Sequence, residues 1–315
     1  MQAGRKRDHL EQREHEQYEG LILRSQGGFY QVRLDTGGEL QCRGRGRFRK
    51  EETQLVVGDR VVVQPTEEES GFITGLLPRK NHLIRPPVAN IDRLVLVVSS
   101  TQPAPNLLVI DKLTAIAARR EIPVVLVFTK ADLADTADLA ELYAGAGYPV
   151  YQADSLSGRG TAPVGEACAR GITAFCGNSG AGKSSLLNAI FPELGLATGG
   201  ISRKLGRGRH TTRHVELFPT GRGGYIADTP GFSAVEFLQF ERMPAGELAG
   251  CFPEFIPHMG GCRFTGCSHR VEKGCRVLEA VAAGEIAGSR HQSYCTIYEE
   301  LQTLKEWELR RPEGR

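Results

Sequence analysis

The sequence predicts a multidomain protein: a small β-barrel, a central α/β unit with a parallel sheet, and a mostly helical, cysteine-rich C-terminal unit. Residues 18–77 alternate short β-rich runs with glycine turns, which is the pattern of a five-stranded barrel. From about residue 90 to 235, continuously apolar runs alternate with helical stretches, which is typical of a parallel sheet covered by helices. Beyond that point β-rich runs become scarce, and three of the eight cysteines fall between positions 262 and 275.

These observations divide the chain into four segments: a charged N-terminal tail (1–17), the barrel domain (18–86), the α/β domain (87–235) and the C-terminal domain (236–315). We expect Pro86 and Pro87 to act as a linker. The tail lacks the apolar core of a signal peptide, and no apolar run reaches the roughly 18 residues of a membrane span. We therefore expect a cytoplasmic protein without membrane association.

The α/β rhythm defines the elements of the central domain. Strands are expected at 93–100, 123–128, 148–153 and 172–176, and helices at 107–120, 137–146 and 162–170. In the C-terminal domain a long helix is expected from Ser289 to about Arg310.

A G-x-x-x-x-G-K-[ST] motif lies between the last of these strands and a helix. We predict that it binds nucleotide through Gly177, Asn178, Ser179, Gly180, Ala181, Gly182, Lys183, Ser184 and Ser185. Backbone N–H groups and the helix N-terminus of such a loop surround phosphate oxygens. Lys183 is expected to reach the β- and γ-phosphates as a catalytic residue, and the Ser184 hydroxyl to ligate Mg²⁺. The loop alone also fits ATPases and nucleotide kinases.

A guanine-recognition motif is predicted directly after the strand at 123–128. Thr129, Lys130, Ala131 and Asp132 resemble the N-K-x-D motif of GTPases, in which the carboxylate accepts from two donors of guanine that adenine does not offer together. The alternative is a surface turn between a strand and a helix. Thr129 stands where Asn is usual, and we expect a less rigid loop because a hydroxyl makes fewer hydrogen bonds than an amide. The segment 154–158 (DSLSG) occupies the position of the loop whose backbone contacts guanine.

The two switch motifs follow the phosphate loop. Asp228 and Gly231 belong to a D-x-x-G motif, in which the carboxylate holds Mg²⁺ through water and the glycine amide senses the γ-phosphate. Upstream of it, Thr211 or Thr212 is placed to complete the Mg²⁺ shell. The guanine motif therefore precedes the phosphate loop, the reverse of the usual order, which indicates a circularly permuted GTPase.

The residue after the D-x-x-G motif is Phe232, where many GTPases have a glutamine that orients the attacking water. We expect hydrolysis to be slow or to use a group from elsewhere. His210 is the candidate in this chain for orienting the water as a catalytic residue. The alternative is that His210 contacts RNA or a partner.

Three thiolates and one imidazole fall close together in the C-terminal domain, at Cys262, Cys267, His269 and Cys275. This ligand set suits tetrahedral Zn²⁺ in a closed structural site. The alternative is buried free cysteines beside a surface histidine. The other five cysteines are scattered, and we expect them to be ordinary thiols.

Taken together, these motifs resemble one family, the circularly permuted, ribosome small-subunit-dependent GTPases of bacteria. The resemblance covers nearly the whole chain and rests on VVGDRV (56–61), LPRKNHLIRPPVANID (77–92), GNSGAGKSSLLN (177–188), GRGRHTTRHVEL (206–217), DTPGF (228–232), CFPEF (251–255) and the cysteine cluster. It implies an OB-fold barrel, a permuted GTPase domain, a zinc-binding C-terminal domain, and a role in late maturation of the 30S subunit. We expect 30S subunits, 16S rRNA and GTP or GDP as partners, and a monomer.

A run of alternating arginines in the barrel (Arg43, Arg45, Arg47 and Arg49) is the candidate RNA-binding surface. In one β-strand all four side chains share a face, which suits contact of an OB-fold with rRNA. The alternative is a solvated edge strand. Two rival functions remain: an rRNA-binding protein whose nucleotide pocket is structural, and an ATPase or small-molecule kinase.

Overall fold

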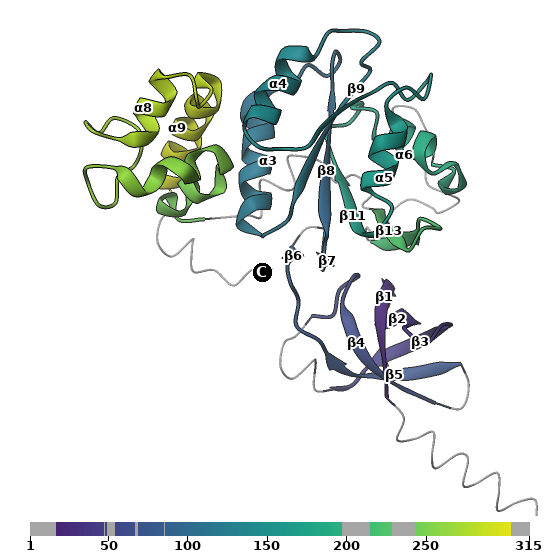
Figure 1. Ribbon diagram of the computed structural model, residues 1–315. Coiled ribbons are helices and arrows are strands. Elements are labelled where there is room, and N and C mark those ends of the chain that lie inside the picture. The colour runs from purple at the N-terminus through teal and green to yellow at the C-terminus, as the bar shows by residue number, and fades with distance from the viewer. Residues whose placement is uncertain are drawn as a thin grey trace, which may run out of the picture.

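The computed structural model describes residues 17–46, 48, 54–66, 69–84, 86–196, 215–228 and 243–303, which form three units (Figure 1). The barrel lies at one end of the α/β unit, and the C-terminal unit lies against one side of it. No helix among these residues combines the length and the apolar character needed to cross a membrane.

The N-terminal unit is a closed five-stranded barrel, as predicted. Its strands are β1 (Tyr18–Gln26), β2 (Phe29–Leu34), β3 (Glu39–Gly44), β4 (Arg60–Pro65) and β5 (Ser70–Leu76). The strand order is β1-β2-β3-β5-β4, and β4 pairs back onto β1. Alternate residues of each strand point inward, and the fully buried ones include Ile22, Val32, Cys42, Val61, Val63 and Ile73. This closed order is that of an OB-type barrel.

The arginine run does not form one continuous strand, so that part of the prediction is wrong. Strand β3 ends at Gly44, and Gly46 and Phe48 have helical backbone. The Phe48 N–H donates to the Arg45 carbonyl at 3.1 Å, which closes a helical turn and ends the two-residue alternation. Arg43 is exposed on β3, Arg45 follows its end, and positions 47 and 49 lie outside the described residues.

The connection between barrel and α/β unit is a short hairpin, which differs from the expected linker. Strands β6 (His82–Leu83) and β7 (Val88–Ala89) pair with each other, and the two prolines lie in the turn between them. The buried Asn81 side chain exchanges two hydrogen bonds with the backbone of Ile91, at 2.8 and 2.9 Å. These bonds tie the hairpin to the start of the α/β unit.

The α/β sheet has the order β10-β9-β8-β11-β13-β12, and all but its last pair is parallel. Its strands are β8 (Arg93–Ser99), β9 (Val124–Thr129), β10 (Val150–Ala153), β11 (Gly171–Cys176), β12 (Glu216–Pro219) and β13 (Gly224–Asp228). The four predicted strands are all present. Strand β12 also pairs with β1, so the barrel and the α/β sheet are continuous.

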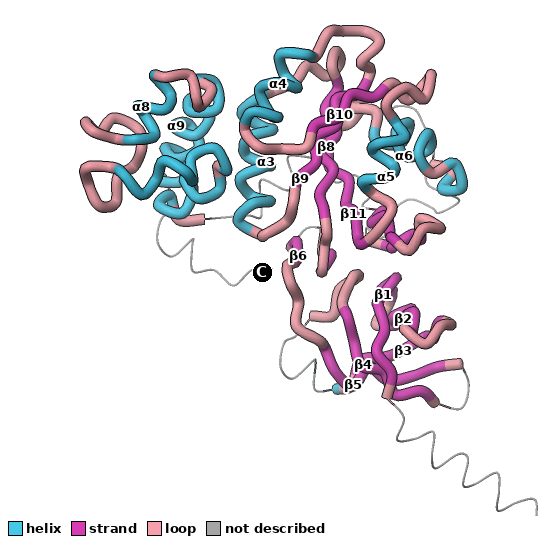
Figure 2. The backbone as a smooth tube through the Cα atoms, viewed as in Figure 1, coloured by secondary structure: helices cyan, strands magenta, loops and turns pink. Residues whose placement is uncertain are grey.

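Helices cover both faces of this sheet (Figure 2). On one face lie α3 (Leu107–Arg119) and α4 (Ala137–Gly145), and on the other α5 (Thr161–Ala167) and α6 (Lys183–Ile190). The three helices predicted at 107–120, 137–146 and 162–170 are therefore present.

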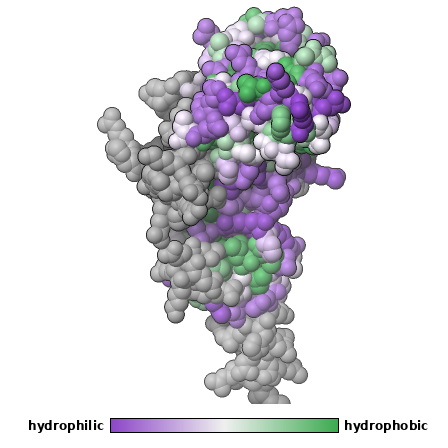
Figure 3. Space-filling view, turned by 90° about the vertical axis from the view of Figure 1, so that its left-hand side faces the viewer, coloured by the Kyte–Doolittle hydropathy of each residue, from purple (hydrophilic) through white to green (hydrophobic). Residues whose placement is uncertain are grey.

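The described part of the C-terminal unit, 243–303, consists of helices joined by loops, the longest of which spans residues 262–275. It contains the 3-10 helices η2 (Ala245–Cys251) and η3 (Pro253–Gly261), and the α-helices α8 (Arg276–Ala282) and α9 (Gly288–Gln302). On the side turned away from the α/β unit, apolar and polar residues are interspersed (upper part of Figure 3). The apolar face of the unit is instead directed at α3, with Phe252, Phe255 and Tyr294 packed ring against ring.

A buried ion cluster fastens the C-terminal unit to α3. The Arg290 side chain is 1% exposed and lies 2.5 Å from Asp111 of α3 and 2.7 Å from Glu254 of η3. Burial acts to lower the pKa of Arg290, but the hydrogen bond with Glu254 and the charge of Asp111 outweigh it, and the pKa is raised. Because removing one partner would leave an unpaired buried charge, this cluster holds the two units in one arrangement.

Candidate nucleotide and metal sites

The motifs predicted to bind nucleotide meet at one edge of the parallel sheet. The guanine motif follows β9, segment 154–158 follows β10, and the phosphate loop follows β11. Asp228 is the last residue of β13, the neighbour of β11. Ligands of open α/β sheets bind at the carboxyl ends of the strands, so the fold brings these distant segments to the expected place.

The phosphate loop is shaped by two glycines that no other residue could replace without strain. A Cβ on Gly177 would lie 2.3 Å from the Val97 carbonyl oxygen, so the loop passes directly over β8. Gly182 has φ +89° and is the N-cap of α6, whose first residue is Lys183. A left-handed residue at this point turns the chain so that consecutive N–H groups face inward, which is the geometry that binds phosphate.

The Lys183 ammonium group lies over the loop itself. It donates to the Gly177 carbonyl and lies 3.5 Å from the Asn178 carbonyl. Burial lowers its pKa, since the charged form is partly removed from water. A cation held here, at the start of a helix, is placed to stabilise the negative charge of a bound phosphate.

Thr129 joins the guanine motif to the phosphate loop. Its hydroxyl donates to the Ala181 carbonyl at 2.6 Å, lies 3.3 Å from the Val98 carbonyl, and belongs to a side chain that is 1% exposed. We expected a looser loop from the replacement of Asn by Thr. The buried hydrogen bond shows instead that this threonine ties the two loops together.

Lys130 forms a second connection between the same loops. Its ammonium group donates to the Gly180 carbonyl at 3.0 Å and to the Gln102 carbonyl. The next two residues of the motif are closer to solvent: the Ala131 N–H donates to the Ala153 carbonyl at 3.4 Å, and Asp132 is exposed. The carboxylate therefore lies at the rim, where it is accessible to a base.

The segment after β10 is a tight, self-bonded turn. Asp154 accepts from the N–H groups of Leu156 at 2.9 Å and Ser157 at 3.1 Å, and the pKa of Asp154 is lowered mainly by its hydrogen bond with the Ser157 hydroxyl. Leu156 projects outward and is 91% exposed. The turn thus presents an apolar side chain next to the loop that carries Asp132.

The sequence did not point to the segment before α3 as part of the site. The Gln102 carbonyl accepts from both Lys130 and the Ser99 hydroxyl, the latter at 2.9 Å. Asn106 caps α3 by accepting from the Val109 N–H at 3.2 Å. The only sequence signal was a cluster of prolines and polar residues that indicates a loop, not its contact with the guanine motif.

Several predicted site residues lie outside the described part of the chain. These are His210, Thr211, Thr212 and Gly231, together with Phe232. For Asp228 the structure places the backbone at the end of β13, paired with Glu216 of β12.

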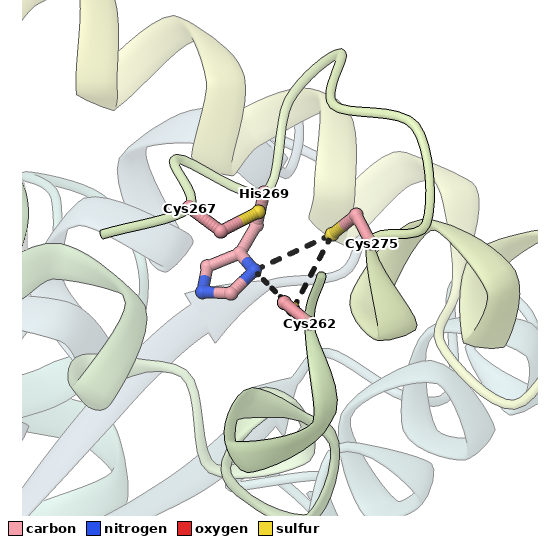
Figure 4. A group of neighbouring side chains, drawn as sticks. All are labelled: Cys262, Cys267, His269 and Cys275. Atoms are coloured by element: carbon pink, nitrogen blue, oxygen red, sulfur yellow. Dashed lines mark hydrogen bonds between the residues drawn. The ribbon is translucent and has the colours of Figure 1, made fainter. Parts of the chain in front are cut away.

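The cysteine cluster assembles as predicted (Figure 4). The four ligand atoms of Cys262, Cys267, His269 and Cys275 lie within 4.8 Å of one another. His269 Nδ1 is 3.4 Å from the Cys275 sulfur and 3.6 Å from the Cys262 sulfur, and these two sulfurs are 3.9 Å apart. A tetrahedral ion bound by sulfur at about 2.3 Å has ligand atoms about 3.8 Å apart, so the cluster fits such an ion.

A carboxylate and α9 hold the metal loop in shape. Glu272 accepts from three N–H groups, those of Ser268 at 2.7 Å, Arg270 at 3.0 Å and Val271 at 3.1 Å. The His291 ring lies 2.8 Å from the His269 carbonyl, which connects the loop to α9. These supports could not be predicted from the sequence, because a single acidic residue in a loop has many possible roles.

The fold and the nucleotide site define a P-loop GTPase in which the guanine motif precedes the phosphate loop, joined to an OB-type barrel and a helical unit whose cysteine cluster has the geometry to hold a metal ion. Family models for the RsgA GTPase and the RsgA N-terminal domain match residues 76–238 and 19–73. The chain belongs to the RsgA GTPase family and is a GTP-hydrolysing enzyme.

Individual relatives and solved structures support the same family assignment. The chain is 42% identical to the small ribosomal subunit biogenesis GTPase RsgA of Geobacillus kaustophilus, over 91% of this chain and 98% of that protein. It is 43% identical to the protein of the same name from Moorella thermoacetica, over 90% and 97%. Crystal structures of YjeQ from Thermotoga maritima (TM-score 0.79, 35% identity, covering 92% of this chain and 100% of that one) and of YloQ, a circularly permuted GTPase (0.76, 35%, 93% and 97%), share its fold.

Proposed function

We propose that this enzyme hydrolyses GTP to GDP and phosphate during biogenesis of the small ribosomal subunit, and that it binds the 30S subunit and its 16S rRNA. The observation that carries this is the pair of contacts by which Thr129 and Lys130 join the guanine motif to the phosphate loop. A base held at one loop and phosphates held at the other then belong to the same ligand. The names of the relatives supply the ribosomal context.

In this proposal Asp132 accepts from guanine, and residues 177–185 surround the phosphates. Lys183 stabilises the charge that develops on the β–γ bridge and the γ-phosphate as that bond breaks. Ser184 is the proposed direct ligand of Mg²⁺ and Asp228 would hold the ion through water, because the start of α6 and the end of β13 lie at the same sheet edge. When bound, Mg²⁺ neutralises phosphate charge, as the family's chemistry requires.

We assign the switch functions to residues outside the described part of the chain. Thr211 or Thr212 completes the Mg²⁺ shell, the Gly231 amide contacts the γ-phosphate, and His210 orients the attacking water. The support is their position between motifs that the fold brings together, and the absence of a glutamine at Phe232. Stimulation by the ribosomal subunit would then consist of ordering these groups around the nucleotide.

We propose that the cluster at Cys262, Cys267, His269 and Cys275 binds one Zn²⁺, whose three thiolates and one imidazole suit that ion. Elemental analysis of the purified protein is expected to find about one zinc per chain. Cys267→Ser should unfold the C-terminal unit, because a structural zinc site supplies folding energy directly. Cys168→Ser changes a buried cysteine outside the cluster and should retain the metal. A protein without zinc would contradict the assignment.

The remaining proposals concern organisation. We infer domain boundaries at 17/18, 86/87 and 235/236, a cytoplasmic location, and a monomer. Limited proteolysis tests the domain boundaries, and cleavage within β7 would contradict them. Light scattering tests the monomer, and a stable dimer at micromolar concentration would contradict it.

Nucleotide competition tests the activity itself. Phosphate release from GTP should be abolished by excess unlabelled GDP and unaffected by equal concentrations of ADP, because only guanine offers both donors to Asp132. Inhibition by ADP as strong as that by GDP would assign the site to an adenine nucleotide.

A further inference from the structure

A row of four side chains crosses the outer face of the barrel. In the pairing register Phe29 of β2 is opposite Arg43 of β3, Arg43 is opposite Phe72 of β5, and Phe72 is opposite Gln64 of β4. Residues paired in this way point to the same face of a sheet. The four strands therefore align one phenylalanine on each side of Arg43, with Gln64 next to Phe72.

This row faces solvent although its strands have a well-filled interior. Phe29 is 36% and Phe72 is 42% exposed, whereas the adjacent inward residues Val32, Cys42 and Ile73 are fully buried. The two rings are thus outward by strict alternation and are not part of the core. Large exposed aromatic side chains on a sheet face commonly mark a binding surface.

The arginine adds a flat cation to the row. Its guanidinium carbon lies 4.3 Å from the centroid of the Phe29 ring, within the range of a cation–π contact. This contact holds the guanidinium close to the ring, where its second face and the Phe72 ring are available to a planar ligand. Beyond the row, Arg45 donates to Gln64, which brings a second positive charge to the same edge.

Charge on these strands favours an anionic polymer. The one carboxylate on β2, β3, β4 and β5 is Glu39, and it is paired with Arg33. Between that pair and the aromatic row lie Gln31 and Gln41, opposite each other. The Gln31 amide nitrogen donates to Glu39 and its oxygen remains an acceptor, whereas the Gln41 amide offers both a donor and an acceptor. Aromatic rings, amides and arginines together match bases and phosphates of single-stranded RNA.

We propose that Phe29, Arg43 and Phe72 form a stacking platform for unpaired RNA bases, with Gln31 and Gln41 contacting base edges. This proposal rests on the proposed function in that it takes RNA as the ligand of the barrel. The stacking platform differs from the contact predicted for the arginine run, because that contact is with phosphates and does not depend on whether bases are present. Base-dependent affinity separates the two.

The test uses the full-length chain and two fluorescein-labelled RNA probes of twelve nucleotides, one of oligouridine and one abasic at every position. The wild type should bind oligouridine at least tenfold more tightly. The double variant Phe29→Ala/Phe72→Ala should lose this preference and retain its affinity for the abasic probe, since the phosphate contacts persist. Arg43→Lys should reduce the preference while keeping the salt dependence, because lysine preserves the charge but not the flat stacking surface.

A matched control comes from the C-terminal unit. Phe264 is 50% exposed and has the Arg263 guanidinium 5.4 Å from its ring centroid, but it is not on the barrel. Phe264→Ala should leave the base preference intact. Unchanged GTP affinity shows that the α/β unit of each variant has folded, and retained affinity for the abasic probe shows the same for the barrel.

Three results would overturn the platform. One is equal affinity of the wild type for both probes, and another is an undiminished preference in the double variant. The third is weaker binding of the double variant to small ribosomal subunits with unchanged binding to oligouridine, which would assign the row to a protein partner. A wild type that binds small subunits but neither RNA probe would contradict RNA binding by the barrel as well.

Discussion

The nucleotide pocket and the outer face of the barrel both suit phosphorylated ligands, but they are constructed differently. The pocket is lined by backbone: the left-handed turn at Gly182, and the carbonyls of residues 177, 180 and 181, which hold the surrounding side chains in place. The barrel face is made of side chains projecting from strands whose backbone is fully used in pairing. In the pocket a side chain holds the backbone of a neighbouring loop in place, whereas on the barrel a side chain would contact the ligand without holding the backbone.

This difference predicts unequal sensitivity to substitution. Loss of one group in the pocket removes both a ligand contact and a support of the loop. On the barrel the same loss leaves the strand pairing intact and removes only side-chain contacts, such as that between Arg43 and Phe29. Effects should therefore be large and localised in the pocket, and small and cumulative on the barrel.

The largest effect is expected at Lys183. Lys183→Ala removes the only cation that the described loop directs at the phosphates, and should reduce kcat/KM for GTP by roughly a hundredfold or more, about 3 kcal/mol of transition-state stabilisation. Ser179→Ala is the control, because Ser179 is exposed and the substitution keeps its backbone N–H group in the loop. Steady-state phosphate release measures both. Full activity of Lys183→Ala would contradict the assignment of the phosphate loop.

Asp132 should determine which base is accepted. Asp132→Asn replaces an acceptor by a group that can also donate. The variant should prefer xanthosine triphosphate to GTP, with a change of about a hundredfold in the ratio of the two affinities. Competition between the two nucleotides for a fluorescent GDP analogue measures this. Asp135→Asn, a neighbouring exposed carboxylate, should leave the preference unchanged. Retained selectivity for GTP in Asp132→Asn would show that another residue recognises the base.

Thr129 should have an intermediate effect. Thr129→Val keeps the shape but leaves the Ala181 carbonyl without its partner, which costs about 1–3 kcal/mol and should weaken GDP binding by roughly tenfold. Thr136→Val is a matched control, because the buried Thr136 hydroxyl makes no hydrogen bond to any described residue. Isothermal titration calorimetry with GDP compares the two. Equal losses would mean that burial of a hydroxyl, and not the link between loops, governs the result.

The smallest effects per residue are expected on the barrel. Neutralising Arg43, Arg45, Arg47 and Arg49 should leave GTP binding unchanged and reduce the slope of log K against log salt for binding to small subunits by about 0.7 for each arginine that contacts a phosphate. A titration of binding at several salt concentrations measures the slope. An unchanged slope would favour a solvated edge over an RNA-binding surface.

The sequence predicted the pocket better than the barrel face for the same structural reason. A G-x-x-x-x-G-K-[ST] motif specifies a backbone path, and the strands on either side of it followed from continuous apolar runs such as 93–100 and 123–128. The arginine run depended on register, and a helical turn closed by Phe48 and Arg45 interrupted it. Alternating residue types cannot show where a strand ends when the segment contains glycines, because glycine adopts both extended and helical backbone.

Contacts between distant segments were also beyond the sequence. Arg290 and Asp111 are separated by 179 positions, and nothing in either local pattern indicates a buried ion pair. The Thr129 hydrogen bond was missed because the motif was compared with its usual asparagine, and not with the carbonyl that a hydroxyl could reach. The four residues of the cysteine cluster could be predicted to lie together because all of them fall in one short loop.

The central claim is that this GTPase acts on the small ribosomal subunit and completes its catalytic site there. Single-turnover hydrolysis of GTP, measured with and without purified small subunits for the wild type and His210→Ala, tests it most directly. We expect the wild type to be slow alone and faster by orders of magnitude with subunits, and His210→Ala to lose most of that stimulation while binding GTP normally. A normal stimulated rate in His210→Ala would assign the water to another group. Equal wild-type rates with and without subunits would contradict the account.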